Sequence, residues 1–378
     1  MLKRILLFLV ISITFFSCEK DDDNNNDNNS DNYNRSEMLI HWADNIIIPA
    51  YDAFYDKLIT LDSSVDAFIN NSNLSNHENL SNSWLECYKY WQHVEMFNIG
   101  KAEILYYKEK MNIYPTDQFL IESNIENGNY DIDNNANFDA RGFPAIDYML
   151  HGLADNNEDI IEIYNSNSNY YIYLKDLVTS MLGFTTLVID DWNTYRDEFI
   201  SSTNNTSTSS INKMTNDFIF YFEKGFRANK IGIPAGVFSA GTTYPEKVEA
   251  FYKKNVSKEL ALEALNACKN FFIGRSFSTQ NINNSLLVSE NIGLGLGSYL
   301  DSLAMSSENN LSNEIFTEFN NAETELNLLN DNFIDQINNN KLQMLYAYDV
   351  VQQLVVSFKV DMLASLAISV DYVDADGD

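Results

Sequence analysis

The sequence predicts an all-α protein made of two helical bundles. Apolar residues recur at intervals of three and four along most of the chain after residue 35, which is the period of an amphipathic helix. We find no stretch in which apolar and polar residues alternate over the length of a strand. Only 14 glycines and 5 prolines occur in 378 residues, which suits long helices with few turns. These observations favour helix-on-helix packing.

The chain begins with a predicted export segment. Lys3 and Arg4 precede an apolar run, residues 5–16, that is short for a membrane span and typical of a signal-peptide core. Ser17 and Cys18 follow it directly, as in the lipobox of bacterial lipoproteins. We therefore expect residues 1–17 to be removed and Cys18 to carry lipid, which would anchor the protein to the outer membrane, facing the periplasm or the cell surface. A plain secretory peptide is the alternative.

Residues 18–35 are acidic, rich in asparagine and almost free of apolar side chains, so we expect a disordered tether. A first helical bundle is predicted over residues 36–200. Residues 201–210 contain only Ser, Thr and Asn and read as a linker. A second bundle is predicted over residues 211–378.

Within the first bundle, Ser36 is a plausible cap for a helix over 36–69, and Pro49 is expected to kink or break it. Residues 81–107 place Trp84, Cys87 and Trp91 on one helical stripe. A long polar connection then covers 108–142. Helices are expected from about Pro144 and over 168–200.

The second bundle is expected to contain a series of helices and one buried central helix near the end of the chain. The predicted helices cover 211–228, 245–254, 257–273, 284–304, 308–338 and 341–371. His77 lies in a polar segment and is predicted to be in a loop. The formal net charge of −30 at pH 7 argues against a nucleic-acid partner, because the phosphate backbone would repel such a chain.

Four segments together resemble the imelysin family. They are HWADNIIIPAYDAF (41–54), SWLECYKYWQHVEMFNIG (83–100), RGFPAIDYMLHG (141–152) and KIGIPAGVFSAGTTYPEKVEAFY (230–252). The resemblance covers the chain from about residue 36 and implies a two-bundle helical protein of the periplasm or outer membrane. It also implies a role in iron or haem acquisition, with some members classed as metallopeptidases.

The marker motif of that family, Gly-x-His-x-x-Glu, falls on residues 142–147. Gly142 matches, Pro144 stands in place of the His, and Asp147 stands in place of the Glu. Proline is favoured at the first position of a helix, so a simple helix start explains this stretch. The departure from the motif puts the metal site of the family, and any peptidase activity, in doubt.

Asp147 and His151 are four residues apart and should share one helical face. One carboxylate and one imidazole make an incomplete metal site. If a carboxylate from another helix joined them, the set would suit iron. The family resemblance implies that this carboxylate is Glu95. Asp147, His151 and Glu95 are therefore the candidate metal ligands.

Lys224, Arg227 and Lys230 lie in a predicted cationic loop that could hold an anion such as a carboxylate or a haem propionate. A charged helix end is the alternative. The sequence contains neither a GxSxG elbow nor an HExxH motif.

Three functions remain open at this stage. The first is a lipoprotein that binds iron or haem for uptake. The second is a metallopeptidase. The third is a scaffold that works beside an outer-membrane uptake receptor. We predict no catalytic residue, and iron or haem is the expected ligand.

Overall fold

The computed structural model describes residues 33–282, 291–304 and 310–372. The predicted signal peptide, Cys18 and the tether up to residue 32 lie outside these ranges, so they stay predictions. Within the described ranges the fold is all-α, as predicted, and contains no strand; an isolated bridge joins Arg275 and Ile292. Contacts group residues Asn34–Asp378 into one unit, and the expected domain boundary at 201–210 stays a prediction.

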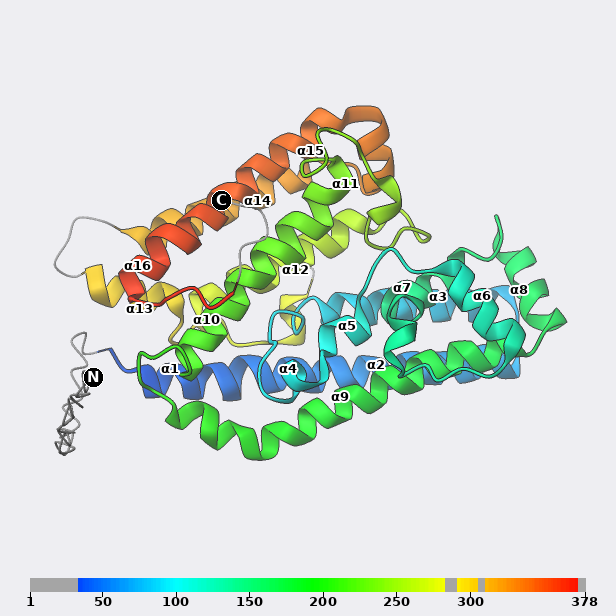
Figure 1. The fold of residues 1–378 in the computed structure, drawn as a ribbon, viewed down its shortest axis with the longest axis horizontal. Coiled ribbons are helices and arrows are strands. Elements are labelled where there is room, and N and C mark those ends of the chain that lie inside the picture. Colours follow the sequence, from blue (N-terminus) through cyan, green and yellow to red (C-terminus); the bar gives the residue numbers. More distant parts are fainter. Residues whose placement is uncertain (1–32, 283–290, 305–309, 373–378) are drawn as a thin grey trace, which may run out of the picture. The chain divides into compact units, whose positions relative to one another are not determined.

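The helices of the first half run to residue 201 (Figure 1). They are α1 (Arg35–His41), η1 (Trp42–Ile47, π-helical), α2 (Ile48–Asn70), α3 (Leu74–Trp91), α4 (Lys101–Leu105), α5 (Tyr107–Met111), α6 (Gln118–Asn127), η2 (Asn135–Ala140, a 3-10 helix), α7 (Gly142–His151), α8 (Asn157–Ser166) and α9 (Asn169–Ser201).

The helices of the second half begin at residue 210. They are α10 (Ser210–Phe220), η3 (Tyr221–Gly232, π-helical), α11 (Ile233–Ala235), η4 (Pro245–Lys247, a 3-10 helix), α12 (Ser257–Ile273), η5 (Thr279–Asn281, a 3-10 helix), α13 (Leu296–Ala304), α14 (Leu311–Asn327), α15 (Phe333–Val356), η6 (Ser357–Met362, π-helical) and α16 (Leu363–Leu366).

In the first half, α2 packs along both α3 and α9, and α7 contacts α3 and α9 (Figure 1). The face of α2 that includes Tyr51, Phe54 and Leu58 is buried because its apolar side chains recur with the helical period. Of the described helices, α9 has the length and composition to cross a membrane. In this fold its contacts with α2 and α7 bury apolar side chains such as Leu177.

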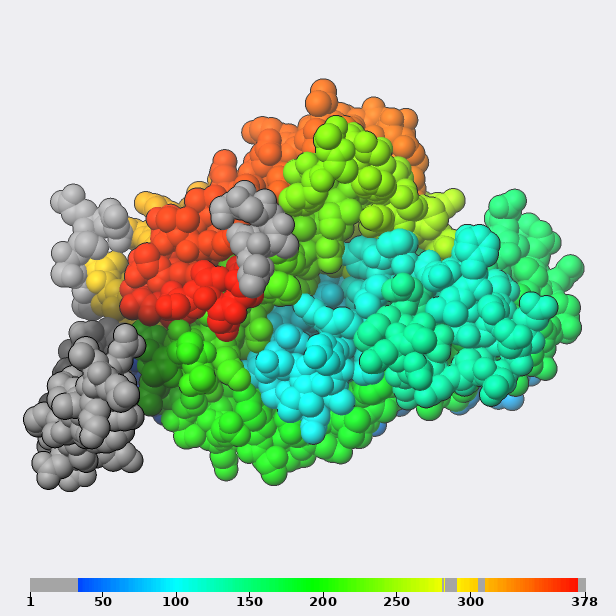
Figure 2. Space-filling model, in the orientation of Figure 1, coloured from blue at the N-terminus to red at the C-terminus, as the bar shows by residue number. Residues whose placement is uncertain are grey.

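In the second half, α12, α14, α15 and η3 pack around a cluster of aromatic rings. The rings of Phe319 and Phe358 contact each other, and both contact Phe222 and Phe272, with centroids 5.1–6.2 Å apart. Such distances are typical of packed aromatic pairs in a protein core. The short helices α4 and α5, coloured cyan in Figure 2, lie at the surface and contact α9.

The two halves meet where α3 contacts α12. Just beyond the end of α3, His93 Nε2 lies 2.6 Å from Glu263 Oε1, and both side chains are buried. Lys89 Nζ also lies 3.2 Å from Glu259 Oε1. Polar contacts therefore link the two halves at this junction.

Several predicted elements differ from the structure. The predicted helix 245–254 is wrong: only the 3-10 turn η4 forms there, and Ala250 and Lys254 have positive φ angles that a helix does not allow. The connection 108–142 contains α6 and η2. His77 is not in a loop but buried within α3.

Other boundaries shift by smaller amounts. The first helix is capped by Asn34, whose side chain accepts from the Glu37 amide, and not by Ser36. Pro49 does not break this helix, because it lies in the first turn of α2, directly after the π-helical η1. The predicted helix 308–338 divides between α14 and α15. Of the helix predicted over 284–304, residues 284–290 lie outside the described ranges, residues 291–295 are not helical, and α13 covers Leu296–Ala304.

Candidate functional site

The stretch Gly142-Phe143-Pro144 forms the start of α7. Gly142 has a φ angle of +74°, and a Cβ atom there would collide with the backbone carbonyl of Met111. Glycine is therefore required at this position. Pro144 is the third helical residue, not the first as predicted. It is still tolerated, because the first four N–H groups of a helix have no acceptor within the helix.

Asp147 is held by two backbone amides from the other half of the chain. The amide of Tyr252 donates to Asp147 Oδ2 and the amide of Lys253 donates to Oδ1, and each donor–acceptor distance is 2.9 Å. The Asp147 side chain is 2% exposed. Hydrogen bonds of this kind offset the cost of burying a polar side chain.

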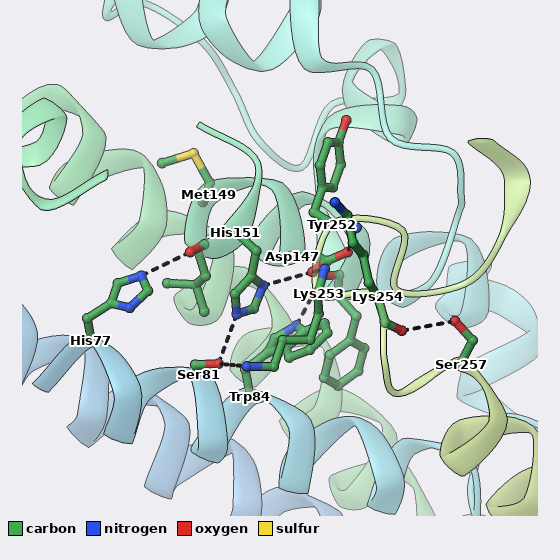
Figure 3. Close-up of polar contacts among 12 residues, drawn as sticks. His77, Ser81, Trp84, Asp147, Met149, His151, Tyr252, Lys253, Lys254 and Ser257 are labelled. Atoms are coloured by element: carbon green, nitrogen blue, oxygen red, sulfur yellow. Dashed lines mark hydrogen bonds and ion pairs between the residues drawn. The ribbon is translucent and has the colours of Figure 1, made fainter. Parts of the chain in front are cut away.

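Asp147 and His151 share one helical face, as the spacing predicted. His151 Nδ1 lies 2.9 Å from Asp147 Oδ1. The other ring nitrogen, His151 Nε2, lies 2.8 Å from the hydroxyl of Ser81 on α3. Lys253 Nζ donates to the same hydroxyl at a distance of 2.7 Å. Figure 3 shows these side chains converging from three separate segments of the chain.

The remaining neighbours of His151 hold its ring in place. Trp84 packs edge-on at a centroid distance of 5.4 Å, and its indole N–H donates to the Phe143 carbonyl. His77 lies 6.4 Å away and bonds through Nε2 to the Leu150 carbonyl. Burial lowers the pKa of His77 and also lowers the pKa of Lys253.

Glu95 belongs to a second polar cluster, which surrounds a cavity of about 270 Å³ between α5, α10 and η3. The residues that line the cavity include Glu95, Glu109, Asp217 and Tyr221. Glu95 Oε2, Glu109 Oε2 and the Tyr221 hydroxyl are buried and have no hydrogen-bond partner among the described residues. Buried polar atoms are normally paired, so these three need an explanation.

A buried ion pair lies behind this cavity. Lys230 Nζ lies 2.6 Å from Glu249 Oε2, and both side chains are 2% exposed. The Asn112 side-chain amide donates to Glu249 Oε1 at a distance of 3.1 Å and to Glu95 Oε1 at a distance of 3.3 Å. Burial raises the pKa of Glu95; the charge of Lys230 opposes this shift and that of Glu249 adds to it.

The two clusters are neighbours but do not merge. Asp147 and Pro144 line an open pocket of about 540 Å³ together with Tyr114. Burial raises the pKa of that tyrosine, and the charges of Glu249 and Glu95 add to the shift. The segment 245–257 contributes to both clusters, through Glu249 to one and through the amides of residues 252 and 253 to the other. No contact joins Glu95 to Asp147 or His151 in the described part of the chain.

The three predicted metal ligands are therefore only partly brought together. Among residues 33–282, 291–304 and 310–372, no three His, Cys, Asp or Glu side chains are arranged to hold one metal ion. The metal role of Asp147, His151 and Glu95 stays a prediction.

The predicted cationic loop is helical, since Lys224, Arg227 and Lys230 lie on η3. Each contacts a carboxylate of the same chain: Lys224 and Arg227 lie 3.1 and 3.6 Å from Glu223 Oε1, and Lys230 pairs with Glu249. Their predicted role in binding an anion is not tested by these contacts.

Sequence reasoning missed Ser81 and Lys253 as members of the Asp147 cluster. They come from segments far from α7 along the chain and carry no local motif. It also missed Glu109, Asp217 and Tyr221 around Glu95. The regular helical spacing of α10 and η3 was the available clue, but it does not reveal which polar side chains face a cavity.

Comparison with known proteins agrees with this fold. An imelysin-like protein from Psychrobacter arcticum has a TM-score of 0.68 and 16% sequence identity, covering 89% of this chain and 97% of its own. A "putative iron-regulated protein A precursor" from Parabacteroides distasonis has a TM-score of 0.70 and 16% identity, covering 88% of this chain and 95% of its own. No curated protein matches the sequence. A sequence profile described as Imelysin matches residues 47–359, and the chain therefore belongs to the imelysin family.

Proposed function

We propose that this imelysin-family protein is an exported, lipid-anchored binding protein for iron acquisition, and that its ligand is a small iron-bearing molecule held in the cavity at Glu95. One observation carries the proposal. Three residues that line this cavity carry buried polar atoms without a partner among the described residues: Glu95 Oε2, Glu109 Oε2 and the Tyr221 hydroxyl.

The charges around the cavity favour a cationic centre in the ligand. Burial and the nearby charge of Glu249 raise the pKa of Glu95, which means that the ionised carboxylate lacks sufficient counter-charge. A bound cation would supply that charge. Carboxylate and phenol oxygens are hard ligands, and iron bound by oxygen donors fits them.

The ligand is expected to bring part of its own coordination shell. The described residues hold no ready-made group of three ligands for a bare ion. Lys108 and Lys224 also line the cavity, and their charges suit the anionic groups of a chelator. A volume of about 270 Å³ is near the lower end for ligand pockets, which favours a small iron complex over haem.

The anchor on Cys18 and a partnership with an outer-membrane uptake receptor remain part of the proposal. The structural neighbour named as iron-regulated supports a link to iron at the level of fold similarity. A metallopeptidase is the second candidate function, and a scaffold without a ligand is the third.

The test is a titration of the protein lacking residues 1–18 with ferric citrate, followed by calorimetry and by metal analysis after gel filtration. We expect about one iron per chain. Glu95→Gln should weaken binding at least roughly tenfold, because it removes a charged ligand from a buried site. Glu126→Gln on α6 changes the same charge at an exposed position and should bind as the wild type does.

Equal affinity in the wild type and in Glu95→Gln would contradict the proposal. If the protein bound no iron, the iron-binding proposal would be wrong, and a scaffold without a ligand would be the function that remains. Chelator-sensitive hydrolysis of a protein substrate would favour the metallopeptidase.

A further inference from the structure

The environment of Ser81 differs from that of other serines in these helices. Ser63 and Ser64 donate to the backbone carbonyls four residues earlier, a common arrangement for a helical serine. The Ser81 hydroxyl is instead engaged by two ionisable side chains, with His151 Nε2 at 2.8 Å and Lys253 Nζ at 2.7 Å.

One assignment of the protons satisfies these hydrogen bonds and makes His151 a base toward Ser81. The Lys253 ammonium only donates, so the Ser81 oxygen accepts from it and directs its own hydrogen toward His151 Nε2. His151 then carries its proton on Nδ1 and donates it to Asp147. This is the tautomer that a histidine needs in order to act as a base toward a serine.

Asp147 is held in a fixed orientation against His151, the proposed base. Its two oxygens accept the amides of Tyr252 and Lys253, so the carboxylate cannot rotate away from the imidazole. Trp84 packs against the His151 ring from the side of α3. The geometry therefore satisfies both bonds of a nucleophile–base–carboxylate relay.

We propose that Ser81 is the nucleophile of an acyl-transfer site in which His151 is the general base and Asp147 positions it. This activity is independent of the iron ligand, because the pocket at His151 and Lys253 shares no lining residue with the cavity at Glu95.

The reaction balances with these groups alone. The Ser81 oxygen attacks an ester carbonyl carbon while its proton passes to His151 Nε2. The Lys253 ammonium, 2.7 Å from the Ser81 oxygen, is the cation available to stabilise the negative charge that develops on the carbonyl oxygen. The bond to the leaving alcohol breaks, and the alcohol takes the proton from His151. Water, deprotonated by His151, then releases the acyl group as a carboxylic acid and restores Ser81.

The surface around the cluster limits the substrate. His151, Tyr252 and Lys253 line an open pocket of about 580 Å³. Ser81 is 3% exposed and is not among the lining residues, but its hydroxyl bonds to His151 and Lys253, so a substrate has to pass between these two side chains. Only a small acyl group on an accessible ester can reach that depth. The substrate class is therefore a small ester and not an internal peptide bond.

The test uses a small alkyl fluorophosphonate, which modifies activated serines, on the protein lacking residues 1–18. We expect one adduct by intact mass, mapped by peptide sequencing to Ser81. Ser81→Ala should abolish it, and His151→Gln should slow it by roughly a hundredfold. Ser83→Ala is the matched control, since Ser83 lies on the same helix but bonds to the Ser64 hydroxyl, and its labelling should equal that of the wild type.

Failure of the wild type to label faster than Ser81→Ala, or an adduct at another residue, would overturn the proposal. Circular dichroism of each variant separates lost reactivity from lost folding. Glu95→Gln should keep full labelling, and a chelator should not affect it, so this result is distinguishable from failure of iron binding.

Discussion

At the residue scale, Asp217 shows how burial couples the cavity to pH. Burial and the charges of Glu103 and Asp371 raise its pKa to about 8, against the opposing charges of Lys108 and Lys213. The folded protein therefore keeps this carboxyl group protonated near neutrality, whereas the unfolded chain ionises it with a pKa near 3.8.

The sign of the resulting pH dependence follows from proton counts. Between about pH 4 and pH 8 the folded state binds more protons than the unfolded state, so stability falls as the pH rises. The slope from a single proton is at most about 1.4 kcal/mol per pH unit, and partial exposure of Asp217 reduces it.

We predict that Asp217→Asn flattens this loss of stability in the ligand-free protein. Its free energy of unfolding should fall less than that of the wild type between pH 5 and pH 8, as measured by urea denaturation. Asp190→Asn on α9, at an exposed position, should follow the wild type. Parallel curves for the wild type and Asp217→Asn would show that Asp217 does not titrate in this window.

Whether a residue of the site could be predicted from the sequence depends on how far its partners lie along the chain. The spacing of four between Asp147 and His151 was sufficient to predict that they share a face. Ser81 and Lys253 could not be found in this way, because their contact with His151 depends on the packing of α3, α7 and the segment 245–257. Glu95 was suggested only by the family resemblance, and its unpaired oxygen became visible in the structure alone.

At the element scale, the segment 245–257 explains a failed prediction. Its residues have a helix-like pattern, but the amides of Tyr252 and Lys253 donate to Asp147 and not to carbonyls within a helix. A buried carboxylate is a strong acceptor, so it outweighs a weak local preference for helix. A partner about a hundred residues earlier cannot be read from the local sequence.

We predict that Asp147→Ala loosens this segment. Hydrogen–deuterium exchange in the peptide that contains Tyr252 and Lys253 should accelerate at least roughly tenfold, because two hydrogen bonds to a charged group are lost. Asp147→Asn keeps one carbonyl acceptor and should have an intermediate effect. Unchanged exchange in Asp147→Ala would show that the segment is held by its other contacts.

Helices whose ends are locally encoded were predicted well. The predicted helix 257–273 agrees with α12, which ends before Gly274 in the left-handed conformation. The helix that contains Pro49 was also predicted. The break expected at the proline does not occur, because the π-helical turn η1 precedes it and accommodates it.

At the scale of the whole molecule, the two halves share buried polar groups. His93 pairs with Glu263 at 2.6 Å, Asn112 donates to Glu249, and Asp147 holds the amides of residues 252 and 253. Separation of the halves would replace these bonds with bonds to water, so each bond contributes a modest net stabilisation to the junction. The helical period predicted the all-α class, but these links arise from side chains that meet only after folding.

We therefore predict that cutting the linker does not separate the halves. A protease site placed at residues 204–208, which are exposed, can be cleaved in the folded protein. The two fragments should elute together in gel filtration and unfold in one thermal transition, because the buried links remain. The same insertion combined with Glu263→Ala leaves His93 buried without its partner and should lower the midpoint of that transition. Two separately eluting, folded fragments would instead show that each bundle is an independent domain and that the contacts across α3 and α12 contribute little to its stability.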